Sequence, residues 1–420
     1  MSVSSVPAPR SSIKKPSWSA ALRHALQVYL PMRIVLSGLA ALLRGLYQGD
    51  LSPDPVFRPY LGIAPVTGGL RGLLLGVWQR WDTLWYMLIA RDGYSMQDTR
   101  IFAPPLYPWL MRWLGAVFGG GETALLLAGL IISNTACLAL FVYLYLLADL
   151  EWDAVRAKRT VVYLAMFPSA FFLLAGYAES LFLLCTVAAF YYARRGQWLV
   201  AGIWGLFAPL ARLPGVVIVV PLGWEFLRQW WGFGDGGIRA LEARTTGRRS
   251  PVAWWQGWPL ALVGVGGLFY PLYAYWVVGS GSLLAPFTVH TQRFMGRFAW
   301  PWESLWTAVR VLASGQFRLI EPFDLLSALL FLVLTVLSFW KLPTLYALYM
   351  AALMGGTLTK VSEIQPLLAV TRYVLVLFPA FFLLAKWGWQ KAWVNRLVVY
   401  GGTALQIFML GQFVIWGWVG

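Results

Sequence analysis

Asp82 is the residue of this sequence whose type and surroundings most clearly point to chemistry. It lies in the segment Arg80-Trp81-Asp82-Thr83-Leu84-Trp85-Tyr86, although only 12% of the chain is charged and 59% is hydrophobic. Carboxylates serve proteins as general acids and bases, and an ionisable group in a chain built for lipid is costly unless it has a role. The alternative is that Asp82 caps or solvates a helix at the membrane surface. Composition leaves both interpretations open.

The elements that must position Asp82 are helices lying in the membrane interface. Residues 77–91 predict a helix with an aromatic and aliphatic face, which is typical of interfacial helices and consists of Trp78, Trp81, Trp85 and Leu88. Asp82 and Tyr86 are four residues apart, so they are neighbours on the adjoining face. Residues 106–118 are short for a span and predict a second interfacial helix.

The rest of the chain predicts an all-α polytopic membrane protein. Its mean hydropathy is +0.65, and its 25 Trp and 19 Tyr are typical of aromatic belts at membrane surfaces. We expect about eleven transmembrane helices, some short or tilted, at residues 27–46, 123–148, 160–176, 178–193, 198–211, 213–228, 258–278, 323–341, 343–358, 372–387 and 397–418. The run 160–193 must turn back at Gly176-Tyr177-Ala178-Glu179-Ser180, the polar point within it.

The net charge of +16 does not indicate nucleic-acid binding, because the basic residues are spread over short loops between spans. The positive-inside rule places the N-terminus and the basic loops 149–159, 228–257 and 386–396 in the cytoplasm. Residues 47–122 then lie outside, and the outer segments and span ends together hold 11 of the 17 acidic residues. We therefore expect a multi-pass protein of the cell membrane with an extracytoplasmic active site.

A single membrane domain is expected. Residues 1–26 predict a disordered basic cytoplasmic tail, and residues 27–420 predict one membrane-embedded catalytic domain, in which residues 47–122 form the first extracytoplasmic loop. No internal repeat is evident. Cys137 and Cys185 lie in apolar segments, which indicates neither a disulfide framework nor a metal site.

Four motifs follow one another along the chain. They are Trp81-Asp82 with Ile89-Ala90-Arg91-Asp92-Gly93-Tyr94 and Pro105-Leu106-Tyr107-Pro108; Phe167-Pro168-Ser169-Ala170 before Tyr177-Ala178-Glu179-Ser180-Leu181-Phe182; Ala211-Arg212-Leu213-Pro214-Gly215; and Arg372-Tyr373 before Phe378-Pro379. In this order they resemble the GPI mannosyltransferase (PIG-V-like) family of the GT-C glycosyltransferases. The resemblance runs from about residue 30 to about residue 385. It implies a GT-C-like helix bundle, here in a bacterial member.

The resemblance also implies a reaction. The donor is a polyprenyl-phosphate hexose, above all mannose, and the acceptor is an extracytoplasmic lipid, glycan or protein. The leaving phosphate is an anion of low basicity, so it needs cations rather than a general acid. The acceptor hydroxyl needs one base, and Asp82 matches the position of the family's catalytic carboxylate. Transfer would invert C1, and a general base contributes about 10²–10⁴-fold.

Cations for the donor phosphate are expected at span ends and in outer loops, because arginine makes forked contacts with phosphate oxygens. The candidates are Arg372, His290, Arg293, Arg297 and Arg212. If residues 290–297 are helical, the three in that stretch share one face. Arginines at span ends also extend to lipid head groups without any catalytic role. Arg372 differs because apolar residues flank it on both sides, where a charge is expensive.

Candidates for contact with the acceptor, or for support of the base, are Glu179, Tyr86, Trp81 and Tyr177. Glu179 is either a second acid that contacts the acceptor or Arg212, or a solvated turn residue. Asp92 is expected to pair locally before Gly93-Tyr94.

Two other classes of function remain open. A lipid or polyprenol transporter would use Arg372 along a path, although transporters usually contain inverted repeats. A membrane-bound acyltransferase would need a catalytic histidine, for which His290 is the plausible residue. No cofactor is expected; divalent metal use stays open, since one carboxylate with dispersed neighbours is a poor site. The sequence contains no Gly-rich phosphate-binding motif, which argues against a nucleotide-sugar donor.

Overall fold

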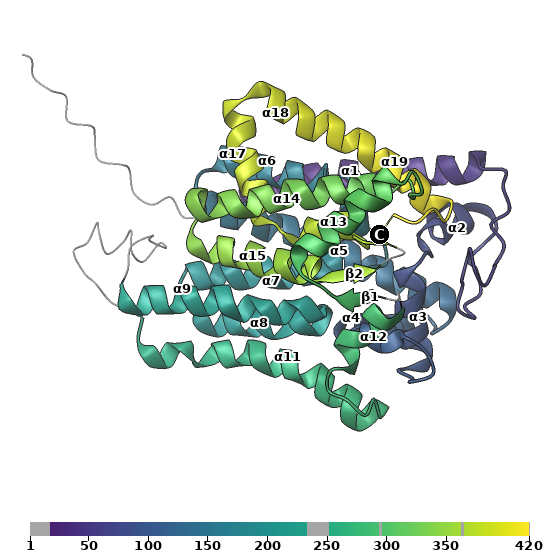
Figure 1. Ribbon diagram of the computed structural model, residues 1–420, viewed down its shortest axis with the longest axis horizontal. Coiled ribbons are helices and arrows are strands. Elements are labelled where there is room, and N and C mark those ends of the chain that lie inside the picture. Colours follow the sequence, from purple (N-terminus) through teal and green to yellow (C-terminus); the bar gives the residue numbers. More distant parts are fainter. Residues whose placement is uncertain (1–16, 233–251, 294–295, 363–364, 420) are drawn as a thin grey trace, which may run out of the picture.

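The computed structural model describes residues 17–232, 252–293, 296–362 and 365–419, and about three quarters of these are helical (Figure 1). The α-helices are α1 (Trp18–Leu46), α2 (Gly69–Leu74), α3 (Asp82–Asp92), α4 (Leu106–Val117), α5 (Glu122–Glu151), α6 (Ala154–Ala165), α7 (Glu179–Arg194), α8 (Trp198–Ala211), α9 (Val219–Trp231), α11 (Ala261–Tyr273), α12 (Ala285–Arg293), α13 (Pro301–Ala313), α14 (Glu321–Lys341), α15 (Thr344–Leu358), α16 (Val370–Tyr373), α17 (Pro379–Gln390), α18 (Ala392–Arg396) and α19 (Gly402–Val414).

Shorter helical turns connect or extend these helices. They are η1 (Gly76–Trp78), η2 (Arg100–Phe102), η3 (Ala170–Leu173), η4 (Leu213–Ile218), η5 (Trp254–Leu260), η6 (Ala274–Val278), η7 (Val374–Val376) and η8 (Leu397–Gly401). One small antiparallel sheet pairs β1 (Gly296–Phe298) with β2 (Lys360–Ser362). The sheet lies with α3 and α12 towards the same end of the bundle (Figure 1).

The protein is a multi-pass membrane protein, as its sequence predicts. Five described helices are long and apolar enough to cross a bilayer: Trp18–Leu46, Glu122–Glu151, Trp254–Val278, Glu321–Lys341 and Ala392–Val414. A sixth is possible if Val370–Val376 and Pro379–Gln390, which meet at 82°, form one broken span. The predicted number of about eleven is not confirmed, because several helices predicted as spans are short: α8 has 14 residues, about 21 Å at 1.5 Å per residue.

The first helix begins before its predicted boundary. α1 starts at Trp18, and the side chain of Ser17 caps it by accepting a hydrogen bond from the amide of Ala20. Residues 18–26 are therefore helical, although the sequence predicted a disordered tail over 1–26. The remainder of that tail lies outside the described residues.

The long helix predicted over residues 77–91 is wrong. The chain forms η1, breaks at Gln79–Trp81, and only then enters α3 at Asp82. The break has a physical cause, because Trp81 has a positive φ of 48°, a conformation outside any right-handed helix. Trp78 is fully buried and Leu88 is 6% exposed. These two side chains pack inside the protein rather than forming a lipid-facing surface.

α7 runs through the middle of the bundle, and its first and last residues, Glu179 and Arg194, both form ion pairs. It packs against α5 and α8, and almost all of its side chains are buried. α5 ends and α6 begins near the C-terminal end of α7, since Glu151 pairs with Arg194. The chain therefore turns back between α6 and α7, close to the predicted reversal at residues 176–180.

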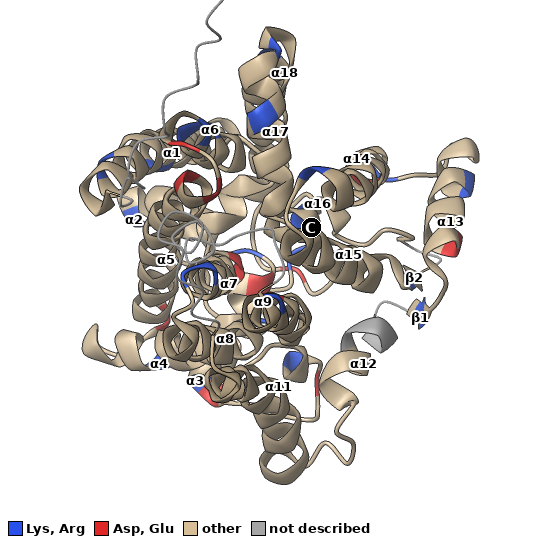
Figure 2. Cartoon of the chain, turned by 90° about the vertical axis from the view of Figure 1, so that its left-hand side faces the viewer, with Lys and Arg blue, Asp and Glu red and all other residues tan. Residues whose placement is uncertain are grey.

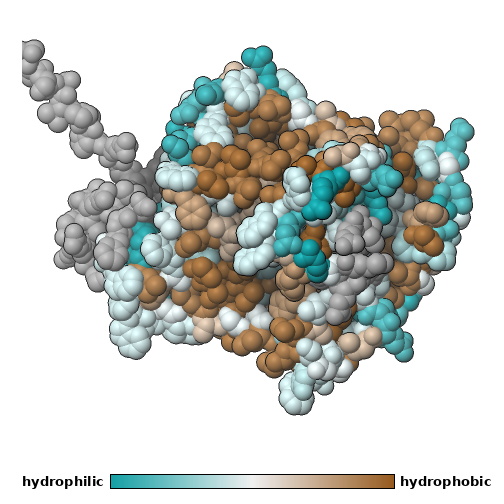
Figure 3. Space-filling model, in the orientation of Figure 1, coloured by the Kyte–Doolittle hydropathy of each residue, from teal (hydrophilic) through white to brown (hydrophobic). Residues whose placement is uncertain are grey.

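The surface and the charge distribution are those expected of a multi-pass membrane protein. Hydrophobic side chains cover much of the middle of one face (Figure 3). Charged residues are thinly scattered among the helices (Figure 2). Inside the bundle, polar atoms must therefore find partners within the protein itself.

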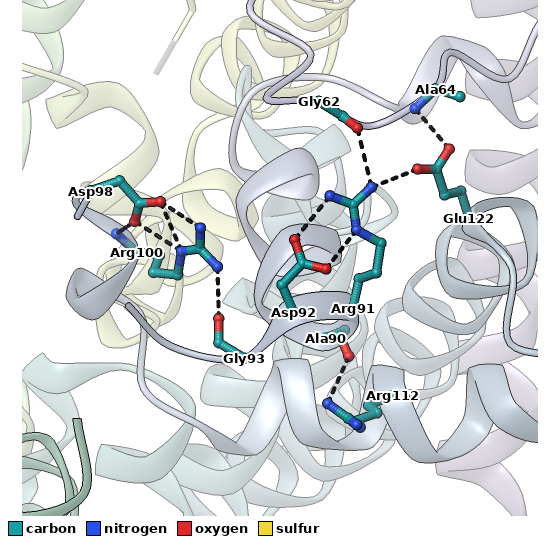
Figure 4. A network of polar contacts seen from close by, with 10 residues as sticks. All are labelled: Gly62, Ala64, Ala90, Arg91, Asp92, Gly93, Asp98, Arg100, Arg112 and Glu122. Carbon is teal, nitrogen blue, oxygen red and sulfur yellow. Dashed lines mark hydrogen bonds and ion pairs between the residues drawn. The ribbon is translucent and has the colours of Figure 1, made fainter. Parts of the chain in front are cut away.

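Ion pairs fix the shape of the first loop (Figure 4). Arg91 contacts both Asp92 and Glu122, each at 2.8 Å, and Arg100 contacts Asp98 at 2.6 Å. Arg91 lowers the pKa of Asp92 by hydrogen bonding and by its charge. Asp92 thus pairs locally, as predicted, and these contacts hold the segment that follows Asp82.

Candidate active site

Asp82 and Arg372 form an ion pair across 290 residues of sequence. Arg372 Nη1 lies 2.6 Å from Asp82 Oδ2. The two side chains differ in exposure: that of Arg372 is 6% exposed and that of Asp82 is 22% exposed. Asp82 is the first residue of α3, where the helix dipole favours a negative charge.

The backbone before each partner is strained. Trp81 precedes Asp82 with φ 48°, and Ala369 begins the turn that carries Arg372 with φ 59°. Positive φ values outside glycine are uncommon and cluster at functional sites, where surrounding structure enforces them. The two residues before Trp81 are held by hydrogen bonds: Gln79 bonds to the backbone of Val66 and Ala64, and Arg80 donates to the carbonyl of Val414.

Asp324 anchors the second turn. Its Oδ1 accepts a hydrogen bond of 2.7 Å from the amide of Thr371, the residue before Arg372. The carbonyl of Thr371 accepts a 2.8 Å bond from the hydroxyl of Ser169. Thr371 is thus held from two sides, and α16 cannot shift without breaking buried hydrogen bonds. Sequence reasoning missed Asp324 because an acid in the first turn of a span looks like an ordinary helix start.

Glu179 lies behind the Asp82–Arg372 pair. It is 2% exposed, so it is not the solvated turn residue that one interpretation of the sequence proposed. Arg212 pairs with Glu179, and Arg372 Nε lies 3.6 Å from the same carboxylate oxygen. We call Asp82, Glu179, Arg212 and Arg372 the Asp82 cluster.

Two tyrosines line the Asp82 cluster. The hydroxyl of Tyr177 accepts a 3.3 Å bond from the amide of Asp82, and Arg372 lies over its ring. Gly176 allows this approach, because a Cβ there would lie 2.7 Å from the Thr83 side chain. Burial raises the pKa of Tyr86, with the charges of Glu179 and Asp82 adding to the effect. Tyr86 is therefore a neutral donor beside the carboxylates.

Two cavities meet at the Asp82–Arg372 pair. The larger, of about 350 Å³, is lined by Asp82, Tyr86, Arg212 and Arg372 together with apolar residues that include Leu213, Val216, Val217, Leu353 and Val376. The smaller, of about 250 Å³, is lined by Asp82 and Arg372 with the aromatic residues Trp81, Trp85, Phe102, Tyr373 and Trp418. The ion pair forms part of the wall of both cavities.

The cations predicted in the 290–297 stretch do not form one helix face. α12 ends at Arg293, and Arg297 lies on β1, so the helical register is broken. Arg297 is 63% exposed and pairs with Glu303 at 2.8 Å. The side chains of His290 and Arg293 lie outside the described residues. A cation that sequence reasoning missed is Lys360, on β2, which lines the larger cavity.

The cluster is electrically balanced by residues of the protein. Two carboxylates face two guanidinium groups, so there is no net negative charge to attract a divalent cation. Among the residues that the structure describes, no three His, Cys, Asp or Glu side chains are close enough to hold a metal ion. What the arrangement offers instead is a carboxylate and a guanidinium group in contact with two cavities.

Known proteins resemble parts of this chain. Residues 56–231 match the family model described as Mannosyltransferase (PIG-V). That segment contains Asp82, Glu179 and Arg212, whereas Arg372 lies beyond it. GPI mannosyltransferase 2 of Chaetomium globosum is 28% identical over 159 residues, which cover 34% of this chain and 32% of that protein. The match thus spans about a third of the curated relative.

Solved structures with a similar trace include the Archaeoglobus fulgidus oligosaccharyltransferase in complex with zinc and sulfate. Its TM-score is 0.43 at 15% identity, over 90% of this chain and 53% of that one. The oligosaccharyltransferase AglB of the same organism, in complex with an inhibitory peptide and a dolichol-phosphate, has a TM-score of 0.44 at 14% identity, over 91% and 56% of the two chains.

The family match and the curated relative agree with the order of motifs read from the sequence. The family model covers the part of the chain that holds the first loop, the turn at Glu179 and the turn at Arg212. Over residues 56–231 the chain is therefore similar to the PIG-V mannosyltransferases.

Proposed function

We propose that this protein is an inverting glycosyltransferase, which moves a hexose, above all mannose, from a polyprenyl-phosphate donor to an extracytoplasmic acceptor. Asp82 is the general base. The observation that carries the proposal is the Asp82–Arg372 pair in the shared wall of two cavities. A transferase needs a base and a phosphate-binding cation between two substrates, and these two side chains supply both.

The larger cavity suits the donor. Its apolar lining offers a prenyl chain contact with hydrophobic side chains, and pockets of a few hundred Å³ are typical of ligand sites. Arg212, Arg372 and Lys360 add positive charge to the same lining. Arginine suits phosphate because its planar fork can hold two oxygens at once.

The smaller cavity suits the acceptor. Its lining is rich in aromatic rings, and it reaches Asp82 from a different set of residues than the donor cavity does. Trp81 Nε1 is a buried donor that forms no hydrogen bond within the described part of the chain. An acceptor bound there would place a hydroxyl within reach of the Asp82 carboxylate.

The proposed reaction is a single displacement at C1 of the sugar. The acceptor oxygen attacks C1 of the sugar and gives its proton to Asp82. The bond between C1 and the phosphate oxygen breaks, and its electron pair leaves with the phosphate. Arg372 and Arg212 stabilise the charge that develops there, which is often the largest catalytic contribution. One displacement inverts C1.

The donor class can be tested with the purified full chain in lipid nanodiscs. Labelled mannose is supplied either on polyprenyl phosphate or on a nucleotide, together with an extract of extracytoplasmic glycolipids and glycans. We expect label to move from the polyprenyl donor alone. Transfer from the nucleotide alone would contradict the proposal. Movement of polyprenyl-phosphate mannose across liposomes without any transfer would favour the transporter instead.

A further inference from the structure

Arg372 has two carboxylates within reach, and its Nε forms no hydrogen bond in the part of the chain that the structure describes. We propose that it is exchanged between anions during the reaction: Arg372 holds Asp82 before the donor binds, then pivots on Glu179 to the donor phosphate and releases Asp82. This inference rests on the proposed function. It makes the base available only after the donor has arrived.

The positive and negative charges of the Asp82 cluster are equal in number. Each of its two guanidinium groups already faces a carboxylate. A sugar phosphodiester brings one further negative charge. Lys360 lines the same cavity, but the cluster itself holds no surplus positive charge. A guanidinium of the cluster can therefore pair with the phosphate only if it gives up a carboxylate. The donor therefore competes with a carboxylate of the protein.

Burial decides which carboxylate loses its partner. The side chain of Glu179 is 3% exposed, whereas that of Asp82 is 22% exposed. A buried charge left without its partner is strongly destabilising, while a partly exposed one keeps some solvation. Arg372 is therefore expected to leave Asp82 and to stay beside Glu179.

The position proposed for Arg372 after the exchange lies close to the one it occupies in the structure. Its Nε is buried and forms no hydrogen bond to any residue that the structure describes. The nearest oxygen of Glu179 lies at 3.6 Å, just beyond hydrogen-bonding range. A small rotation of the guanidinium would close this contact and turn Nη1 away from Asp82. Because Arg372 lines the larger cavity, the same rotation would leave its free edge facing the phosphate.

The exchange has a chemical consequence. A nearby guanidinium favours the ionised form of a carboxylate and so opposes its uptake of a proton. When Arg372 moves to the phosphate, it stops opposing proton transfer to the base and begins to stabilise the leaving group. One residue thus links donor binding to the abstraction of the acceptor's proton, and Glu179 is the positioning residue for that movement.

Binding measured without turnover tests the exchange. Polyprenyl phosphate is titrated against the full chain in nanodiscs, with polyprenol as the probe that lacks the phosphate. The variants are Asp82→Asn and Asp82→Ala, and the matched control is Asp92→Asn, whose acid pairs with Arg91 in the same helix. Thermal unfolding confirms that each variant is folded.

If Arg372 is exchanged, both Asp82 variants bind polyprenyl phosphate about threefold more tightly or better, the scale of one partly exposed ion pair. The control should match the wild type. Equal or weaker binding by both folded Asp82 variants would overturn the exchange, because Asp82 would then merely hold Arg372 in place for the phosphate. If the wild type binds polyprenyl phosphate no better than polyprenol, the proposed donor itself is wrong. That result is distinct from a failure of the exchange alone.

Discussion

Each end of α7 lies in a cluster of two acids and two arginines, and the two clusters differ in how completely their charges are paired. At its first residue lies the Asp82 cluster. At its last residue, Arg194, lies a second set of two acids and two arginines, which we call the Glu225 cluster: Glu151, Arg194, Glu225 and Arg228.

The Glu225 cluster is saturated. Arg194 contacts Glu151 through two nitrogens, at 2.6 and 2.9 Å, and Glu225 through a third at 3.1 Å. Arg228 holds Glu225 through two nitrogens, at 2.9 and 2.6 Å. Tyr346 and Gln229 donate further bonds to these carboxylates. All four charged side chains are at most 7% exposed.

The Asp82 cluster is not saturated. Asp82 has a single contact with Arg372, Arg372 Nε has no hydrogen bond within the described residues, and two cavities border the pair. Charges that satisfy one another completely stabilise a fold but have nothing left for a substrate. The difference supports the proposal that the Asp82 cluster is a binding and reaction site, and we expect the Glu225 cluster to be structural.

The largest expected effect is on stability, at the Glu225 cluster. Glu225→Gln leaves Arg194 and Arg228 without a buried counter-charge, which costs about 3–5 kcal/mol of unfolding free energy. Transfer per folded molecule should not change. Thermal unfolding in nanodiscs, with transfer measured on the folded fraction, gives both quantities. A stable but inactive Glu225→Gln variant would contradict the structural role assigned to the Glu225 cluster.

Next is Arg372→Gln. The loss of this cation should lower transfer by about 10²–10³-fold, as the loss of a donor to developing negative charge does elsewhere. Arg372→Lys should retain part of the rate, because lysine keeps the charge but not the fork. Initial rates at saturating donor measure both. Equal rates for wild type and Arg372→Gln would remove Arg372 from the mechanism.

A smaller effect is expected at Asp324. Asp324→Asn weakens the bond to the Thr371 amide, and one intramolecular hydrogen bond contributes about 0.5–1.5 kcal/mol. We expect the donor KM to rise and kcat to fall, since α16 would hold Arg372 less firmly. Glu321→Gln, in the same turn of α14, is the control. Equal effects of the two substitutions would show that Asp324 does not position Arg372.

The smallest effect is expected at Arg297. This exposed side chain pairs with Glu303 at the surface, and such pairs contribute about 0–1 kcal/mol. Arg297→Gln should therefore leave both the transfer rate and the unfolding temperature nearly unchanged. A loss of transfer comparable to that of Arg372→Gln would instead return Arg297 to the donor site, where the sequence had suggested it.

The sequence predicted the fold class and most of the cluster for one physical reason. Charges are rare in an apolar chain and expensive to bury, so Asp82, Glu179 and Arg372 could be recognised individually. What it could not show was their partners. The Asp82–Arg372 contact depends on bringing together α3 and α16, which no local pattern specifies.

The errors have the same origin. Trp81 was predicted inside a helix because its neighbours have helical spacing, yet packing holds it at a positive φ. Arg297 was placed on a helix face, but Gly296–Phe298 pairs with Lys360–Ser362, more than sixty residues away. The Glu225 cluster was missed because Glu151 and Arg228 were predicted in the cytoplasmic loops 149–159 and 228–257. Its burial depends on α5 and α9, which are distant in sequence.

The most direct test of the central claim compares two acids of one helix. Asp82→Asn and Asp92→Asn are measured for transfer from polyprenyl-phosphate mannose at saturating donor, per folded molecule. Both changes remove one negative charge from α3, but only Asp82 lines the two cavities. We predict that Asp82→Asn loses about 10²–10⁴-fold in rate while Asp92→Asn keeps most of its activity. Equal rates for wild type and a folded Asp82→Asn variant would contradict the assignment of Asp82 as the base.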